Sequence, residues 1–280
     1  MKLGTLVKLA NITEAEEKFA KLKHYDFSSC QLVYKPAVYK KEDAEYIKEV
    51  ADRNGIEISA QFCGYQRTVS IGDNYYNYKI AGLNVEAYRG QRLDYVMNAV
   101  RFASWLGVED IVIHAGYVPN NPFEQEYTNM LTVIHILGTE CKRLGLNILF
   151  ETGMEAPIML LRLIQDVGLD NLFINFDPAN IYLYGLGNPI DALQVFGKYV
   201  RNIHGKDGTL PTDPRQLGKE MPAGKGMVDF PKAFEMLRDL GYDRFVTIER
   251  EITGEQQTKD ILMAKEYFES ILTNLGYTIE

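Results

Sequence analysis

Cysteine is scarce in this sequence. The 280 residues include three cysteines, Cys30, Cys63 and Cys141, which are widely spaced and form no CxxC pair. An odd number of isolated cysteines argues against a disulfide framework and against a zinc ribbon. The pattern is typical of a reducing compartment, so we expect a cytoplasmic protein.

Long apolar runs are also missing. No stretch approaches the roughly 18 apolar residues that a membrane span requires. The short apolar N-terminus is interrupted by Lys8 and followed by acidic residues, including Glu14 and Glu17, rather than by a cleavage site. We therefore expect neither a signal peptide nor a membrane partner, and we assign residues 3–8 to a first strand.

Positive charge is not in excess. Lysine and arginine number 30 against 38 aspartates and glutamates, which gives a formal net charge of −8. Such a chain repels the phosphate backbone, so nucleic acid is a poor candidate partner. The content of 46% hydrophobic and 24% charged residues is typical of a soluble globular protein. We expect residues 1–280 to form one domain with a sizeable core.

Strand and helix signals alternate along the whole chain. The expected strands are residues 3–8, 31–34, 56–62, 110–114, 147–151, 172–177, 200–206 and 245–250. The expected helices are residues 13–23, 41–53, 91–106, 124–144, 156–167, a segment from 188, 229–241 and 253–274. Helix N-caps are expected at Thr13, Asn188, Asp229 and Thr253.

This strict alternation over a chain of this length predicts a closed (β/α)8 barrel. The alternative, a doubly wound open sheet, usually carries a glycine-rich phosphate loop after its first strand. Residues 9–12 occupy that position without a glycine, and neither GxGxxG nor a Walker-type motif is present. Two long loops, residues 63–89 after the third strand and 207–228 after the seventh, are expected over the active face.

Five consecutive expected strands end on a residue that can bind a metal or a substrate: His114, Glu151, Asp177, His204 and Glu249. Any one of them alone is explained as a helix cap or a surface pair. Together they are not, because the carboxyl ends of barrel strands meet at one face. We expect Glu151, Asp177, His204 and Glu249 to converge on one divalent metal. Three carboxylates and an imidazole favour Mn²⁺, with Mg²⁺, Co²⁺ or Zn²⁺ as alternatives.

A metal of this kind predicts a reaction. An ion chelated by a carbonyl and its α-hydroxyl acidifies the intervening C–H and stabilises the enediolate. Glu151 and Glu249 are the expected acid/base pair that removes and returns the proton. We predict a metal-dependent isomerase or epimerase that acts on a small sugar, a sugar phosphate or a polyol ketone.

Short motifs at the expected strand ends and in the last long loop carry a resemblance to a known family: residues 113–116, 150–152, 176–180, 204–208, 224–230, 241–242 and 247–249. Along essentially its whole length the chain resembles the xylose isomerase-like TIM barrel superfamily. The resembling group is that of the sugar phosphate isomerases and epimerases, with ketose 3-epimerases, hydroxypyruvate isomerases and inosose dehydratases. The resemblance implies the same four metal ligands, acid/base roles for Glu151 and Glu249, and a homodimer or homotetramer.

Five further residues are candidates for substrate binding: His114, Glu155, Asn180, Lys206 and Glu251. His114 is alternatively a buried histidine bonded to a neighbouring strand end, and Glu155 a helix N-terminal acid. Lys206 can bind a hydroxyl or an anionic group, or alternatively pair with Asp177 or Glu249. Asn180 stands where some ketose epimerases of the resembling family carry a histidine, so the resemblance does not carry a substrate contact over to this position.

Three other functions remain as alternatives. A lyase of the inosose dehydratase type uses the same metal site and expels a β-hydroxyl. A non-catalytic sugar-binding barrel is favoured by loss of a ligand, and none of the four is lost. An AP endonuclease-like nuclease of the superfamily needs extra histidines, which this chain lacks at Asn180 and around residues 224–226.

Overall fold

Eight parallel strands close into a barrel in the order β1-β10-β7-β6-β5-β4-β3-β2. The computed structural model describes residues 1–36, 39–64 and 82–280. The barrel strands are β1 (Lys2–Val7), β2 (Ser29–Val33), β3 (Glu57–Cys63), β4 (Asp110–Ile113), β5 (Asn147–Glu151), β6 (Leu172–Phe176), β7 (Val200–Gly205) and β10 (Phe245–Ile248). The predicted (β/α)8 barrel is confirmed.

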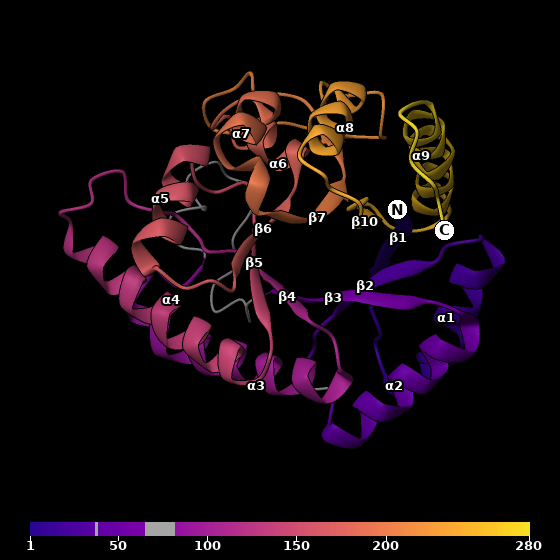
Figure 1. The fold of residues 1–280 in the computed structure, drawn as a ribbon, viewed down its shortest axis with the longest axis horizontal. Helices are drawn as coiled ribbons and strands as arrows, with labels where there is room; N and C mark the ends of the chain where they lie inside the picture. The colour runs from indigo at the N-terminus through magenta and orange to yellow at the C-terminus, as the bar shows by residue number, and fades with distance from the viewer. Residues whose placement is uncertain (37–38, 65–81) are drawn as a thin grey trace.

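Helices surround the barrel on its outer side (Figure 1). They are α1 (Ala15–His24), α2 (Lys41–Asn54), α3 (Glu86–Leu106), α4 (Gln125–Arg143), α5 (Pro157–Val167), α6 (Pro178–Leu183), α7 (Pro189–Phe196), α8 (Phe230–Asp239) and α9 (Glu255–Asn274), with short 3-10 turns at η1 (Ile12–Glu14) and η3 (Gly197–Tyr199). Within the described ranges, no helix combines the length and the apolar character needed to cross a membrane.

The first and last strands complete the barrel. β1 pairs in parallel with β10, from Lys2 opposite Phe245 to Thr5 opposite Ile248. Every residue of β10 is buried, as expected for a parallel strand with helices on one side and the barrel interior on the other. The two chain ends lie close together, because the backbone amide of Glu280 donates to the carbonyl of Met1 at 3.0 Å.

The barrel interior contains both apolar and polar layers. Ala60, Val112 and Leu149 form a small apolar cluster of their own. Polar side chains also meet across the interior, since the Gln31 amide on β2 donates to Asn175 Oδ1 on β6 at 3.0 Å and these two strands are not neighbours in the sheet. Gln31 and Asn175 are both fully buried. This polar layer leads toward the strand ends that carry the candidate ligands.

The ends of several helices differ from those expected. The Thr13 N-cap is wrong: Asn11 Oδ1 accepts from the Thr13 amide at 3.1 Å, and the Glu14 carboxylate accepts from the Ala10 amide at 3.0 Å. α3 begins at Glu86 rather than at 91, because the Arg89 side chain holds the preceding turn through the carbonyls of residues 83 and 84.

The last helix also starts later than predicted. Gly254, rather than Thr253, occupies the N-cap of α9, and no side chain caps that end. The short helix α6 was not expected; it follows β6 at once because Asp177 caps it through the Asn180 amide and Pro178 occupies its first turn. The predicted caps Asn188 and Asp229 are confirmed, since each side chain accepts from backbone amides of the helix that follows it.

The structure describes all of the second expected long loop but only part of the first. Residues 65–81 of the first loop, with Tyr65, Tyr75, Tyr76 and Tyr78, lie outside the described residues. The second loop contains a two-stranded antiparallel sheet, β8 (Asp207–Gly208) with β9 (Glu220–Met221). This small sheet directly follows β7, and so lies beside the strand end that carries His204.

Candidate metal centre

Four acidic or imidazole side chains converge at the carboxyl ends of four strands that are consecutive in the barrel, β5, β6, β7 and β10. Glu151 is the last residue of β5 and His204 lies in β7. Asp177 and Glu249 each come one residue after the end of β6 and β10. One ligand atom from each of the four lies within 4.8 Å of the others, and all four side chains are buried.

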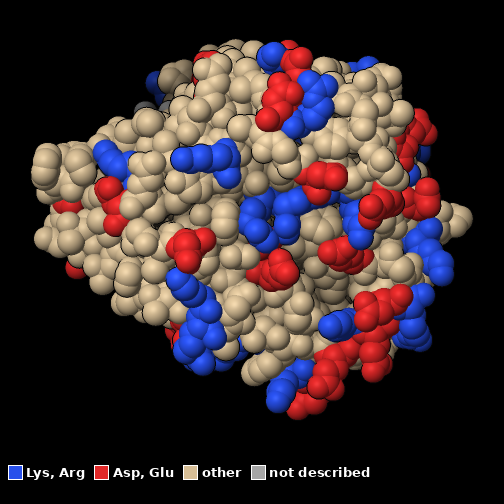
Figure 2. All heavy atoms as spheres, in the orientation of Figure 1, with Lys and Arg blue, Asp and Glu red and all other residues tan. Residues whose placement is uncertain are grey.

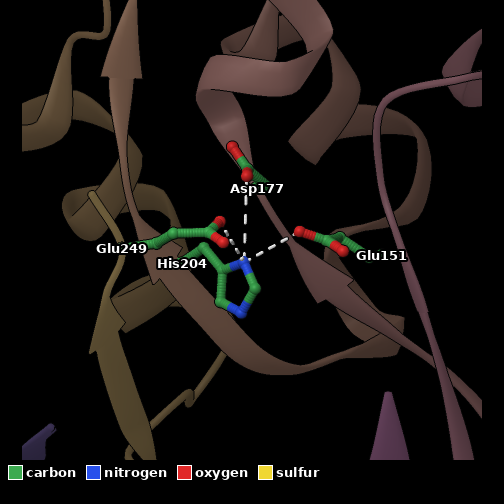
Figure 3. A group of neighbouring side chains, drawn as sticks. All are labelled: Glu151, Asp177, His204 and Glu249. Carbon is green, nitrogen blue, oxygen red and sulfur yellow. Dashed lines mark ion pairs between the residues drawn. The ribbon is translucent and has the colours of Figure 1, made fainter. Parts of the chain in front are cut away.

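His204 lies at the centre of this group. Its Nδ1 is 2.9 Å from Glu151 Oε1, 3.2 Å from Glu249 Oε2 and 3.8 Å from Asp177 Oδ2. Figure 3 shows the three carboxylates approaching the same ring nitrogen from different sides. The structure therefore brings together all four residues that the sequence singled out as ligands.

The chemistry of the group fits a divalent cation. His204 Nδ1, Asp177 Oδ2 and Glu249 Oε2 are buried and make no hydrogen bond to any described residue. Buried polar atoms without a hydrogen bond are costly, and here both carboxylate oxygens lie within ion-pair distance of the His204 ring nitrogen. Several carboxylates and one imidazole suit Mn²⁺, Mg²⁺ or a similar ion. These residues can hold a divalent metal ion.

The electrostatics of the group reflect buried carboxylates that lie beside buried cationic side chains. Burial alone would raise the pKa of Glu151, but the charges of His114 and His204 hold that pKa well below its usual range. Burial opposes the charged form of Glu249 as well, yet Lys206 and His204 lower its pKa to about 2. The pKa of His204 is raised well above its usual value, because Glu249 and Glu151 outweigh burial.

Asp177 behaves differently from the other two carboxyls. Burial raises its pKa, and Lys206 only partly offsets that effect. Its backbone is fixed from both sides by Thr152, whose hydroxyl accepts from the Asp177 amide and donates to the Asp177 carbonyl, both at 2.8 Å. Thr152 was not recognised in the sequence as a site residue, although it directly follows Glu151.

Lys206 is a buried cation at the edge of the group. Its Nζ lies 3.5 Å from Asp177 Oδ2 and 3.4 Å from Glu249 Oε2, and it also pairs with the Glu251 carboxylate. The Asn180 side chain accepts from Lys206 at 3.1 Å. Lys206, Asn180 and Glu251 are thus at the site, as expected, and their contact with a substrate stays a prediction.

His114 and Glu155 complete the set. His114 Nε2 lies 2.9 Å from Glu151 Oε2, on the side away from His204. Glu155 precedes α5 and is buried, with its Oε1 accepting weakly from the Gly153 amide at 3.4 Å. Burial raises the pKa of Glu155 to about 8. A carboxyl that keeps its proton at neutral pH can donate a hydrogen bond as well as accept one.

Gln31 was also not recognised in the sequence. Its Oε1 lies 3.0 Å from His204 Nε2, on the ring edge opposite the three carboxylates. The only signal was a polar residue inside the apolar run of the second strand. A polar residue in an apolar run does not reveal that the Gln31 side chain reaches His204 on the other side of the barrel.

Comparison with known proteins places the chain among related barrels. It is similar to a xylose isomerase domain protein from Planctomyces limnophilus, whose crystal structure matches with 30% identity, a TM-score of 0.89 and 98% of each chain covered. A D-tagatose 3-epimerase-like protein matches with 22% identity, a TM-score of 0.74 and 98% of each chain covered. An inosose dehydratase from Lacticaseibacillus casei is 23% identical over 170 residues, which span 53% of this chain and 56% of the dehydratase.

A family model covers nearly the whole barrel. It is described as xylose isomerase-like TIM barrel, and it matches residues 19–269, a range that contains all four candidate ligands. The resemblance inferred from the strand-end motifs is thereby confirmed. This chain belongs to the xylose isomerase-like TIM barrel family.

Proposed function

We propose that the protein is a divalent-metal-dependent isomerase or epimerase of a small sugar, sugar phosphate or polyol ketone. The observation that carries the proposal is the convergence of three buried carboxylates and His204 Nδ1 within 4.8 Å of one another. A bound divalent ion, Mn²⁺ in the first instance, polarises a substrate carbonyl and so acidifies the neighbouring C–H. Glu151, Asp177, His204 and Glu249 are the residues that would hold it.

Glu151 and Glu249 are the proposed acid/base pair. They come from β5 and β10, the two outer strands of the four that carry the group, and they approach His204 from different directions (Figure 3). Their low pKa values keep both carboxylates ionised, so either one can accept a proton from a carbon placed between them. Removal on one face and return on the other inverts that carbon, which is an epimerisation.

The surrounding polar residues are the proposed substrate contacts. Lys206 carries a positive charge into the site and can orient a substrate hydroxyl or an anionic group. Asn180 lies between Lys206 and Glu151, at 3.1 Å and 3.5 Å. His114, Glu155 and Glu251 add further hydrogen-bonding groups around the site. Basic and acidic side chains are interspersed over one face of the molecule (Figure 2), so this face does not offer the continuous positive surface that a phosphate backbone requires.

A lyase of the inosose dehydratase type is the second candidate. Two observations favour it: the similarity to an inosose dehydratase over half of the chain, and a buried lysine next to the acid/base pair. After the same proton removal, a group that donates a proton to the β-hydroxyl lets it leave as water. Lys206, with its Nζ 3.4 Å from Glu249 Oε2, is the residue that we propose for this role.

Proton exchange with solvent tests the proposal and separates the two reactions. The protein is incubated with Mn²⁺ in D₂O and a panel of ketoses, aldoses, their phosphates and inososes, and each mixture is read by proton NMR. Deuterium at a carbon next to a carbonyl, with the substrate skeleton retained, is the result expected for an isomerase or epimerase. Loss of water identifies a lyase. Full activity after thorough chelation would remove the metal from the proposal.

A further inference from the structure

The side of His204 that faces away from the carboxylates has a partner of its own. Gln31 projects from β2 across the barrel, and its Oε1 lies 3.0 Å from His204 Nε2. Both side chains are fully buried. The ring of Phe62 packs at a tilt beside the imidazole, with 6.1 Å between the ring centroids. One edge of the histidine thus faces the carboxylates and the other faces a single amide oxygen.

The amide of Gln31 is oriented by a second contact. Its Nε2 donates to Asn175 Oδ1 at 3.0 Å, which leaves Oε1 as the atom that faces the imidazole. An amide oxygen only accepts hydrogen bonds, so the proton of this contact belongs to His204 Nε2. A neutral imidazole protonated at Nε2 has its lone pair on Nδ1, the atom that faces Glu151, Asp177 and Glu249.

We propose that Gln31 is a positioning residue of the metal centre: it fixes the ring orientation and the Nε2-protonated form of His204, so that Nδ1 is presented to the cation. The inference rests on the proposed metal site and adds a residue from the opposite side of the barrel. A histidine that ligates a metal usually donates its other N–H to such an acceptor, and loss of the acceptor weakens metal binding.

The structure also provides a way to restore the contact. In Gln31→Glu, a carboxylate oxygen still accepts from His204 Nε2. The other oxygen then needs a donor, and Asn175 can supply one, because its Nδ2 is buried without a hydrogen-bond partner among the described residues. A flip of the Asn175 amide satisfies both groups. Gln31→Leu and Gln31→Met fill the same space and offer His204 no comparable acceptor.

Gln61 is a matched control. It is a fully buried glutamine on β3, the strand next to β2, and its Nε2 donates to the carbonyl of Ala99 at 2.8 Å. Gln61→Leu therefore removes a buried amide from the same barrel without touching the contact of His204. Gln61 faces α3 in the helix layer, so any general effect of losing a buried amide appears in both variants, whereas a specific effect on the metal appears only at Gln31.

The experiment measures the affinity of the full chain for Mn²⁺, with the concentration of free Mn²⁺ determined by electron paramagnetic resonance. Gln31→Leu is expected to weaken binding about ten- to hundredfold, Gln31→Glu to restore it, and Gln61→Leu to leave it unchanged. If Gln31→Leu does not fold, Gln31→Met carries the same expectation. In the ¹⁵N-labelled, Mg²⁺-loaded protein, the His204 Nε2–H signal is expected to be protected from solvent exchange in the wild type and in Gln31→Glu, and unprotected in Gln31→Leu.

Two further sets of outcomes separate the role of Gln31 from the metal centre itself. If Gln31→Leu binds Mn²⁺ as tightly as the wild type, or if Gln61→Leu weakens binding equally, Gln31 has no positioning role and the metal centre stands. If the wild type binds no Mn²⁺, or if binding survives His204→Ala, the metal centre itself is wrong and the role of Gln31 falls with it.

Discussion

Glu151 is the carboxylate that contacts both histidines of the site. Its Oε1 lies 2.9 Å from His204 Nδ1 and its Oε2 lies 2.9 Å from His114 Nε2. Glu151→Gln keeps the size of the side chain but removes the charge and one acceptor. We expect kcat at saturating Mn²⁺ to fall by about 10²–10⁴, the usual contribution of a general acid or base. The rate is measured with whichever substrate the D₂O screen identifies.

A matched change elsewhere controls for this variant. Glu266→Gln removes the same charge from an exposed position on α9, and we expect its kcat to equal that of the wild type. Unchanged activity in Glu151→Gln, with an intact fold, would exclude Glu151 from the acid/base pair.

The raised pKa of Glu155 predicts that the stability of the protein depends on pH. Burial raises its pKa from the ordinary 4.5 to about 8. The folded state therefore holds a proton that the unfolded state releases, and the contribution of Glu155 to stability is lost as pH rises from 4.5 toward 8. Glu155→Gln removes this loss, so its Tm should gain on the wild type over that range. Thermal unfolding with EDTA present checks it.

The exposed Glu266→Gln again serves as the reference for the pH series. Its Tm is expected to follow the wild-type curve at every pH. A constant difference between Glu155→Gln and the wild type would mean that Glu155 is ionised in the folded protein.

The candidate ligands were predictable from the sequence because a strand end is a local feature. Each of Glu151, Asp177 and Glu249 directly follows or ends a short apolar run, and parallel strands place such residues at one face. Gln31 was not predictable in the same way. Its role depends on a partner 173 residues away on the other side of the barrel, and no local pattern encodes which interior side chains meet.

At the scale of elements, one carboxylate organises the loop that follows β7. Asp207 Oδ1 accepts from the amides of Gly208 and Val228, and Oδ2 accepts from those of Gly224 and Gly226, all within 3.1 Å. The loop passes so close that a Cβ on Gly226 would lie 2.1 Å from Asp207 Oδ1. This carboxylate therefore holds residues 224–228 against the end of β7, the strand that carries His204 and directly precedes Lys206.

Asp207→Ala is expected to loosen this loop. It leaves four backbone amides without their acceptor, and water can replace that acceptor at each amide that becomes exposed when the loop opens, so the loss is well below the sum of four full hydrogen bonds. We expect a Tm lower by roughly 5–10 °C and faster proteolytic cleavage between residues 209 and 226. Asp213→Ala changes an exposed aspartate of the same loop and should leave both measurements unchanged. Equal cleavage rates in the two variants would contradict the proposed role of Asp207.

The order of elements was predictable, and their exact ends were less so. The run of strands and helices follows from apolar periodicity, which needs no tertiary information. Helix starts depend on competition between nearby caps. At the first helix, the side chains of Asn11 and Glu14 accept hydrogen bonds from the amides of Thr13 and Ala10, so Thr13 is not the cap. The short helix α6 begins after β6 because Asp177, which is also a candidate ligand, acts as its N-cap. In the sequence, the position of Asp177 at a strand end indicated a metal ligand but did not indicate that the same side chain caps a helix.

At the scale of the whole molecule, the candidate centre spans one half of the barrel ring. Its four side chains come from β5, β6, β7 and β10, and the Gln31 contact reaches it from β2 on the other side. A cation bound there would link strands that are otherwise joined through backbone pairing, and it would neutralise carboxylates held close together. Metal binding is therefore expected to act on the unfolding of the entire chain.

Removal of the metal should lower the stability of the whole barrel. A ligand that binds only the folded state at about 1,000 times its Kd adds about 4 kcal/mol to the free energy of unfolding. For a chain of this size we expect Mn²⁺ to raise Tm by roughly 10 °C over the EDTA-treated protein, measured by calorimetry. His204→Ala should show no such shift, because it lacks the central ligand. An equal rise in the wild type and in His204→Ala would mean that Mn²⁺ binds somewhere other than these four strands.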